Sequence, residues 1–141
     1  MIRRILQKFT GSVCVAGIIV KDNGIYLEKR CKIIPEGGKW ALLGGHVDYG
    51  EKAVEAIKRE IKEETGFNVK NTKFLFYFDE IIPRLKLHNM LLVFRVNVSG
   101  KEKLNWESSE SGWFSRKEVE KMDIGFKHKE VLNRFFNMKK R

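Results

Sequence analysis

The sequence is poor in cysteine and proline, with only two of each among its 141 residues. Two cysteines provide no disulfide framework, and Cys14 and Cys31 are not spaced as a metal-binding pair. Cys14 alternates with apolar neighbours in SVCVAGIIV, which is typical of a small core residue. A reduced, cytoplasmic setting is the simplest expectation for such a chain.

Long hydrophobic runs are also lacking. No apolar stretch approaches the roughly 20 residues that cross a bilayer as a helix, so we expect no membrane partner. The first 20 residues place basic side chains before an apolar run, as a secretory signal does. However, Lys8 and Thr10 interrupt that run, and KDNG follows it where small cleavage-site residues would be expected. We therefore expect a soluble, unprocessed protein.

Acidic residues are outnumbered, with 18 Asp and Glu against 28 Lys and Arg, which gives a formal net charge of +10. A basic surface attracts anions such as phosphorylated metabolites, nucleotides and nucleic acid, although it can also serve solubility alone. Hydrophobic residues make up 43% of the chain, and no repeat, low-complexity tract or linker interrupts it. The sequence predicts one domain over residues 1–141 with a substantial core.

The expected elements predict a mixed α/β (α+β) fold. A β-branched run and its return strand flank KDNG, a hairpin turn signal, and Gly66 is placed as the left-handed cap of a helix. The expected strands are 12–20, 25–30, 40–43, 73–81, 88–98 and one near 112–114, and the expected helices are 51–65, 115–122 and 128–140. This order predicts a mixed sheet sandwiched between helices.

The helix expected at 51–65 crowds three glutamates, Glu60, Glu63 and Glu64, into little more than one turn. Like charges three or four residues apart cost a helix stability. Its apolar stripe is predicted to consist of Ala53, Val54, Ile57 and Ile61. At 100° per residue, and with Val54 as the reference, the glutamates occupy an arc that adjoins this stripe.

The cations of the same helix are poorly placed to neutralise that arc. Lys58 and Lys62 fall nearly opposite it, whereas Arg59 falls beside Glu63 and one turn beyond Glu55, where it links carboxylates of the helix. The pattern predicts a carboxylate stripe that borders the core with no cation of its own. A hard divalent ion, Mg²⁺ or Mn²⁺, would supply one, and a solvated acidic face is the alternative.

Two glycines and the glutamates carry a family resemblance. Gly44 and Gly45 let the backbone approach a ligand closely. Gly45, Glu51, Arg59-Glu60-Ile61, Glu63-Glu64 and Gly66 match the Nudix box at every fixed position, and the sequence resembles a Nudix hydrolase. VAGIIVKDNGIYLEKR resembles the opening hairpin of the MutT-related branch, and HNMLLVFRV and ESGWF resemble later family strands. Leu43 stands where members commonly have proline, which changes loop stiffness but removes no ligand.

The resemblance implies a Nudix fold and a metal-dependent pyrophosphohydrolase that cleaves the diphosphate of a nucleoside diphosphate linked to a group X. By motif position, Glu60, Glu63 and Glu64 would bind Mg²⁺ or Mn²⁺ together with the carbonyl of Gly44. Glu51 and Arg59 would orient this catalytic cluster. Either Glu60 or Glu64 would accept the proton of the attacking water, and the motif leaves this choice open.

Outside the motif, the resemblance suggests roles for four more residues. Arg30 matches an arginine that lies near the phosphates in MutT-like members, although a solvated strand-end arginine is equally expected. Trp40 matches an aromatic that precedes the box, and Trp40 and Gly45 are candidate substrate contacts. Glu110 matches a loop glutamate that binds metal or acts as a base in some relatives, and Glu107 competes for that role.

Other aromatic and histidine side chains suit the core better than the site. Trp40, Phe76, Tyr77 and Phe78 would stack a nucleobase or pack inside the sheet, and His88 is expected to be an ordinary strand residue.

The substrate stays open between ADP-ribose and a nucleoside triphosphate, oxidised or not. Pro83 follows Phe67 by 16 residues, a spacing that resembles the marker of ADP-ribose pyrophosphatases, whereas the opening hairpin favours triphosphates. The net charge of +10 motivates an alternative, removal of pyrophosphate from RNA 5′ ends. A non-catalytic nucleotide-binding module is a further alternative. The oligomeric state is open, and a homodimer is one possibility.

Overall fold

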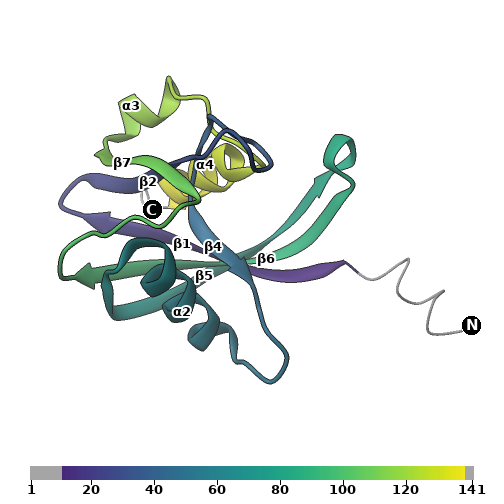
Figure 1. Cartoon of the computed structure of the whole chain (residues 1–141), viewed down its shortest axis with the longest axis horizontal. Helices are drawn as coiled ribbons and strands as arrows, with labels where there is room; N and C mark the ends of the chain where they lie inside the picture. Colours follow the sequence, from purple (N-terminus) through teal and green to yellow (C-terminus); the bar gives the residue numbers. More distant parts are fainter. Residues whose placement is uncertain (1–10, 139–141) are drawn as a thin grey trace, which may run out of the picture.

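The computed structural model describes residues 11–138 and places helices on both faces of a mixed β-sheet (Figure 1). The elements in chain order are β1 (Ser12–Lys21), β2 (Gly24–Arg30), β3 (Trp40–Ala41), β4 (Leu43–His46), α2 (Ala53–Thr65), β5 (Asn68–Ile82), the 3₁₀ turn η1 (Pro83–Leu85), β6 (Leu87–Ser99), β7 (Ser108–Phe114), α3 (Arg116–Glu120) and α4 (His128–Met138). The mixed α+β architecture predicted from the sequence is confirmed. Residues 139–140 of the last expected helix lie outside the described part of the chain.

Strand β1 is the centre of the sheet, and the sheet branches there. One edge of β1 pairs in parallel with β6, which in turn pairs antiparallel with β5. The other edge is shared, because β4 pairs with Cys14–Gly17 while β2 pairs with Val20 and Lys21. Strand β2 continues the second branch to β3 and β7. The ends of β4 and β2 therefore flank the same region beside β1.

Alternation along β1 fills a core on each face of the sheet. Cys14, Ala16 and Ile18 face α4, where they pack in one cluster with its apolar side chains, among them Val131, Leu132 and Phe135. Val15 and Ile19 face α2 and pack with Ile57 and Ile61. Successive strand residues point to opposite faces, so a strand buried on both sides reads as a continuous apolar run. Cys14 is the buried core residue that the sequence predicts.

The local signals at two turns are confirmed. Lys21 pairs with Gly24 across the KDNG turn, and Asp22 takes a positive φ of 54° that a two-residue hairpin requires. Gly66 ends α2 with a φ of 78°, and its N–H donates to the carbonyl of Lys62 at 3.0 Å. A left-handed residue at this position favours glycine, because it has no Cβ.

The buried stripe of α2 differs from the predicted one at Val54. The helix begins at Ala53, and Val54 in its first turn is 40% exposed, whereas Ala56, Ile57 and Ile61 are fully buried. Ala53 packs against the same cluster. The contact with the sheet is therefore rotated away from Val54, and the prediction that Val54 belongs to the buried stripe is wrong.

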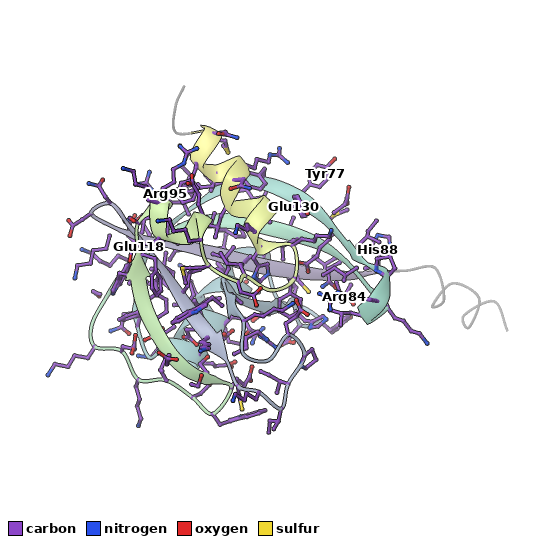
Figure 2. The ribbon with its side chains drawn as sticks, turned by 90° about the horizontal axis from the view of Figure 1, so that it is seen from above. Tyr77, Arg84, His88, Arg95, Glu118 and Glu130 are labelled. Atoms are coloured by element: carbon purple, nitrogen blue, oxygen red, sulfur yellow. The ribbon has the colours of Figure 1, made fainter. Side chains whose placement is uncertain are left out.

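Strands β5 and β6 form a long hairpin that extends away from the rest of the sheet (Figure 1). Pro83 opens the 3₁₀ turn η1 after β5 ends at Ile82. Figure 2 shows Arg84 and His88 together at the far end of this hairpin. His88 lies in β6 and is exposed, as expected of an ordinary strand residue. Within residues 11–138, no helix is long and apolar enough to cross a membrane.

Candidate active site

Arg59 gathers the polar groups on one side of α2. Its Nε and Nη2 donate to the carboxylate of Glu51 at 2.7 and 3.0 Å, and Nη2 also donates to the carbonyl of His46 at 3.0 Å. Its Nη1 lies 2.9 Å from Oε1 of Glu60 and 3.3 Å from Oε2 of Glu63. The prediction that the carboxylate stripe has no cation of its own is therefore wrong, because a long guanidinium reaches both carboxylates.

The neighbours of Arg59 on the helix take other roles. Glu55, an expected partner of Arg59, instead accepts a hydrogen bond at 3.3 Å from the backbone N–H of Lys52 and caps the helix. Lys62 points away from the carboxylates and donates to the carbonyl of Gly66 and to Asn68. The network that holds Glu51, Arg59 and the glutamates together is thus separate from the cap of α2.

Glu60 and Glu64 project from α2 toward β4. A Cβ added at Gly45 would lie 2.5 Å from Oε1 of Glu60, so a glycine at this position makes room for the carboxylate. Glu64 is half-buried and hydrogen-bonds Glu60. Burial, this hydrogen bond and the nearby charges of Glu28 and Glu60 raise the pKa of Glu64 well above its usual range. The two carboxylates form a site whose negative charge is not fully compensated by the protein.

These carboxylates line a cavity of about 490 Å³ at the branch of the sheet. Gly44 and Gly45 of β4 and Glu60 and Glu64 of α2 form one side of the lining. The cavity thus brings together three of the residues predicted for the metal site, Gly44, Glu60 and Glu64, and the predicted substrate contact Gly45. Glu63 is not among the lining residues, because its carboxylate turns to Arg59 and is 57% exposed.

Arg30, at the end of β2, lines the same cavity. Its Nε donates to the carbonyl of Pro35 at 2.7 Å, and its guanidinium lies 4.9 Å from the ring centroid of Phe126. Burial lowers the pKa of this guanidinium, and the carboxylates of Glu107 and Glu64 act against that shift. Arg30 is therefore held in place as a cation facing the carboxylates, and it is not a solvated strand end.

The two competing glutamates near β7 are placed differently. Glu107, just before β7, lines the cavity, and its carbonyl accepts a hydrogen bond from the N–H of Cys31 at 2.7 Å. Glu110 is outside the lining, and its carboxylate is 60% exposed and pairs with Lys29 at 3.4 Å. The geometry favours Glu107 over Glu110 as the additional carboxylate.

Trp40 and the aromatic run of β5 lie apart from the cavity lining. Trp40 packs edge-on against Phe114 at a centroid distance of 4.9 Å and borders the α4-side core. Phe76 is buried, Phe78 is packed against the same core, and Tyr77 is exposed. The placement of Trp40, Phe76 and Phe78 fits the core alternative that the sequence left open, whereas the exposed Tyr77 is not a core residue.

Glu28 is a buried carboxylate that the sequence reasoning missed. It is 3% exposed in the middle of β2 and accepts hydrogen bonds from the hydroxyls of Tyr26 and Ser108. Burial raises the pKa of Glu28 to about 7, and the hydroxyl donors act against that shift. The signal that marks it as inward-facing is its place two residues after the buried Tyr26 in GIYLEKR, on the same face of the strand.

The part of the cavity beyond β1 also has polar residues that the sequence did not single out. Glu80 of β5, Asn89 of β6 and His128 of α4 are buried and line it. They are far apart in the sequence, and Glu80 and Asn89 come together because the two residues pair directly between β5 and β6. Glu80 is spaced from Phe76, Phe78 and Ile82 by even numbers of residues, so it shares their face of the strand. This is the only sequence signal that it faces inward.

The residues at the α2 side fit a hard divalent cation by their chemistry. Carboxylate and carbonyl oxygens are the ligands that Mg²⁺ and Mn²⁺ prefer, and Glu60, Glu64 and Gly44 supply them in one cavity. In the described part of the chain, no three acidic, histidine or cysteine side chains converge as a ready-made metal cage. An incomplete set of protein ligands suits Mg²⁺, which usually keeps several waters and binds substrate phosphates together with one or two carboxylates.

Comparisons with known proteins agree with this geometry. The family model described as NUDIX domain matches residues 9–135. An ADP-ribose pyrophosphatase from Methanocaldococcus jannaschii is 36% identical over 129 residues, covering 91% of this chain and 75% of that protein. Nucleoside triphosphatase NudI from Escherichia coli O139:H28 is 27% identical, covering 81% of this chain and 89% of the relative.

Solved structures show the same fold. A MutT NUDIX hydrolase from Burkholderia pseudomallei matches with a TM-score of 0.75 and 29% identity, covering 87% of this chain and 95% of that one. The MutT protein from Methanosarcina mazei Go1 matches with a TM-score of 0.82 and 24% identity, covering 92% and 96%. The family match over most of the chain, together with the 36% identical relative, confirms the resemblance read from the glutamate helix, and the chain belongs to the NUDIX family.

Proposed function

We propose that this protein is a metal-dependent pyrophosphohydrolase that cleaves the diphosphate of a nucleoside diphosphate linked to another group. The observation that carries the proposal is the convergence of Glu60, Glu64 and Arg30 on one cavity, beside Gly44 and Gly45. Carboxylates that can hold a cation face a guanidinium that can bind phosphate, and a diphosphate needs both.

Each residue has a distinct part in this reaction. Mg²⁺ or Mn²⁺, held by Glu60, Glu63, Glu64 and the Gly44 carbonyl, would neutralise charge on the diphosphate when bound. Arg30 binds a phosphate oxygen from the opposite side of the cavity. Glu60 or Glu64 accepts the proton of the attacking water. Glu107 adds a further carboxylate to this side of the cavity, in the role for which Glu110 was the first candidate.

Arg59 and Glu51 position the catalytic carboxylates without lining the cavity themselves. Two hydrogen bonds from Arg59 to Glu51 fix the guanidinium, and the guanidinium in turn contacts Glu60 and Glu63. Such outer partners typically matter about 10–100-fold for metal affinity or activity.

ADP-ribose is the first substrate to test. The 36% identical relative is named an ADP-ribose pyrophosphatase, and Pro83 has the spacing associated with that group. Nucleoside triphosphates come second, since the NudI relative is named a nucleoside triphosphatase. The purified chain with Mg²⁺ should release AMP and ribose 5-phosphate from the first, or pyrophosphate from the second. No turnover of any nucleotide in the presence of Mg²⁺ or Mn²⁺ would refute the enzyme and leave a nucleotide-binding module.

Triphosphorylated RNA belongs in the same panel because of the net charge of +10. Release of pyrophosphate from RNA that declines steeply with added salt would favour the RNA reading, since phosphate contacts make binding salt-dependent. Indifference to RNA would remove it.

Two variants test the site within the panel. Glu63→Gln and Glu64→Gln each remove ligand charge but almost no volume, so we expect folded proteins that lose more activity than the roughly 100-fold typical of outer partners. Glu55→Gln is the matched control, because it removes one charge from the same helix at the cap. Full activity in both site variants would place the catalytic centre elsewhere.

A further inference from the structure

The cavity extends well past the carboxylates of α2. Gly45 pairs with Val15 on β1, and β1 is followed across the sheet by β6 and then by β5, which has Glu80. Gly45 is level with Tyr77 on β5, so three strand spacings of about 4.8 Å and three residues of about 3.3 Å along the strand place Glu80 roughly 17 Å from Gly45. This span suits a ligand that has its diphosphate at one end and a further ring system at the other.

Glu80 is a buried carboxylate with weak partners. It is 3% exposed and accepts from Nδ2 of Asn89 at 3.2 Å and from the N–H of Lys127 at 3.4 Å. Nε2 of His128 lies 3.6 Å from its Oε2. The Asn89 contact is at the upper end of the usual range of about 2.7–3.2 Å for N–H···O hydrogen bonds, and the other two contacts are longer. Two carboxylate oxygens offer about four acceptor positions, and none of them has a short bond here.

No strong cation balances this carboxylate. Among residues 11–138, His128 is the sole basic side chain within ion-pair distance of Glu80. Nδ1 of His128 accepts from the N–H of Leu42 at 3.1 Å, so the neutral ring has its proton on Nε2, facing Glu80. Burial, together with the charge of Arg30, lowers the pKa of His128 to about 3, which agrees with the neutral ring.

The surroundings of Glu80 suit a flat heterocycle. Leu87, Leu91 and Phe126 line the cavity together with it, and these apolar side chains can cover the faces of a ring. Each oxygen of Glu80 has one donor within the protein, and a ligand that brings an N–H group to the carboxylate can fill a further acceptor position. An exocyclic amino group at the edge of a nucleobase is such a donor.

We infer that Glu80, held by Asn89 and His128, is a specificity-determining residue that accepts a hydrogen bond from an exocyclic amino group of the substrate's nucleobase. The inference rests on the proposed function for the position of the diphosphate, and it narrows the substrates to nucleotides of aminated bases such as adenine, guanine and cytosine. Bases with hydrogen in place of the amino group do not make this additional hydrogen bond to Glu80 and are disfavoured.

Two ligand pairs that differ in one amino group test this directly. AMP is compared with purine riboside 5′-monophosphate, and GMP with IMP, by calorimetric binding to the full chain in the presence of Mg²⁺. We expect the amino member of at least one pair to bind about tenfold or more tightly. Equal affinity within both pairs, or no binding of any of the four, overturns the inference. This measurement needs no turnover, so it is separate from the test of the hydrolase.

The variant Glu80→Gln makes the test specific to one side chain. Its amide replaces one acceptor with a donor, so the preference for the amino member should fall to about equality, whereas a merely structural defect would weaken both members alike. Asp79→Asn is the matched control, since Asp79 is the exposed neighbour on the same strand. An unchanged preference in Glu80→Gln contradicts the inference. If Glu80→Gln does not fold, the wild-type ligand pairs decide.

Discussion

Arg59 sets the charge balance of the candidate site. A guanidinium has five donors in a rigid plane, and Arg59 directs them to Glu51, Glu60, Glu63 and the carbonyl of His46. Glu51 makes the shortest of these contacts, at 2.7 Å, and we expect it to hold the guanidinium in place. The positions of the catalytic carboxylates therefore depend on a residue outside the cavity.

The first prediction concerns Glu51. Glu51→Gln loses the ionic contact with Arg59 but keeps the size of the side chain, so we expect nucleotide turnover to fall about 10–100-fold. Because the defect acts through the metal ligands, a large part of it should be recovered at higher Mg²⁺. The measurement is kcat/KM against Mg²⁺ concentration.

Asp48→Asn is the graded comparison for Glu51→Gln. Asp48 also contacts Arg59, at 3.5 Å, but its carboxylate is 68% exposed, and exposed ion pairs contribute little. Activity within about twofold of wild type is expected for this variant. Equal losses in both variants would mean that Arg59 responds to total charge and is not held by Glu51.

At the scale of elements, one carboxylate joins three segments of the chain. Glu36, in the loop between β2 and β3, accepts from Arg84 of η1 at 2.9 Å and from the N–H of Phe126 ahead of α4 at 2.8 Å. Lys39 lies 3.4 Å away. The side chain of Glu36 is 4% exposed. These contacts tie the β5–β6 hairpin and the start of α4 to the loop that follows Arg30.

The second prediction concerns the pH dependence of this contact. The hydrogen bond from Arg84 lowers the pKa of Glu36 from 4.5 to about 2. Because the folded value is depressed, the stabilisation is present above pH 4.5 and is lost as the pH falls toward 2. Glu36→Gln should therefore lower the free energy of unfolding by on the order of 2 kcal/mol at pH 7, and by progressively less as the pH falls below 4.5. Urea unfolding at a series of pH values measures both.

Glu130→Gln is the control for this series. Glu130 pairs with Lys127 at 3.3 Å on α4 and is 58% exposed, so its loss should change stability by less than about 0.5 kcal/mol at any pH. A difference between Glu36→Gln and wild type that stays constant with pH would show that the charge of Glu36 is not responsible.

Features that depend on residues adjacent in the sequence were predicted correctly, whereas features that depend on contacts between distant residues were not. The KDNG hairpin and the Gly66 cap depend on a few adjacent residues, and both are found as expected. Helical geometry with Val54 as the reference extended the buried face to a residue that is 40% exposed. With Ile57 as the reference, the half-buried Glu64 lies about 20° away, at the border of the buried face. Which apolar residue marks the centre of the face depends on where the sheet packs, and the helix sequence alone does not say.

The sequence pattern around each residue does not predict the part of the cavity beyond β1. Glu80 and His128 meet because β5 pairs with β6 while α4 packs across the same face, and no motif links positions so far apart. The sequence left the choice between Glu107 and Glu110 open for a similar reason, because the path of the chain into β7 decides which of them faces the cavity. The motif positions predicted the glutamates of the candidate site, but not which of their side chains point away from the cavity.

At the scale of the whole molecule, the charge is divided unevenly. The chain has a formal net charge of +10, yet Glu28, Glu60, Glu64 and Glu107 are close enough to raise the pKa of Glu28 or Glu64, and two of the four lie on α2. Arg30 and Arg59 balance only part of this local charge. We therefore expect a cation that binds in the cavity to stabilise the folded chain, because the unfolded chain has no such cluster.

The third prediction is that Mg²⁺ or Mn²⁺ raises the thermal midpoint of the protein. A ligand at about 100 times its Kd adds about 2.7 kcal/mol, which for a chain of this size corresponds to a rise of roughly 5–10 °C. Sodium chloride at matched ionic strength screens charge without binding in the cavity, so it should raise the midpoint much less. The double variant Glu60→Gln/Glu64→Gln should lose the metal-dependent rise, and chelation should reverse it in the wild type. An equal rise with sodium, or an undiminished rise in the double variant, would mean that these carboxylates do not hold the ion, since the stabilisation would then come from the surface as a whole.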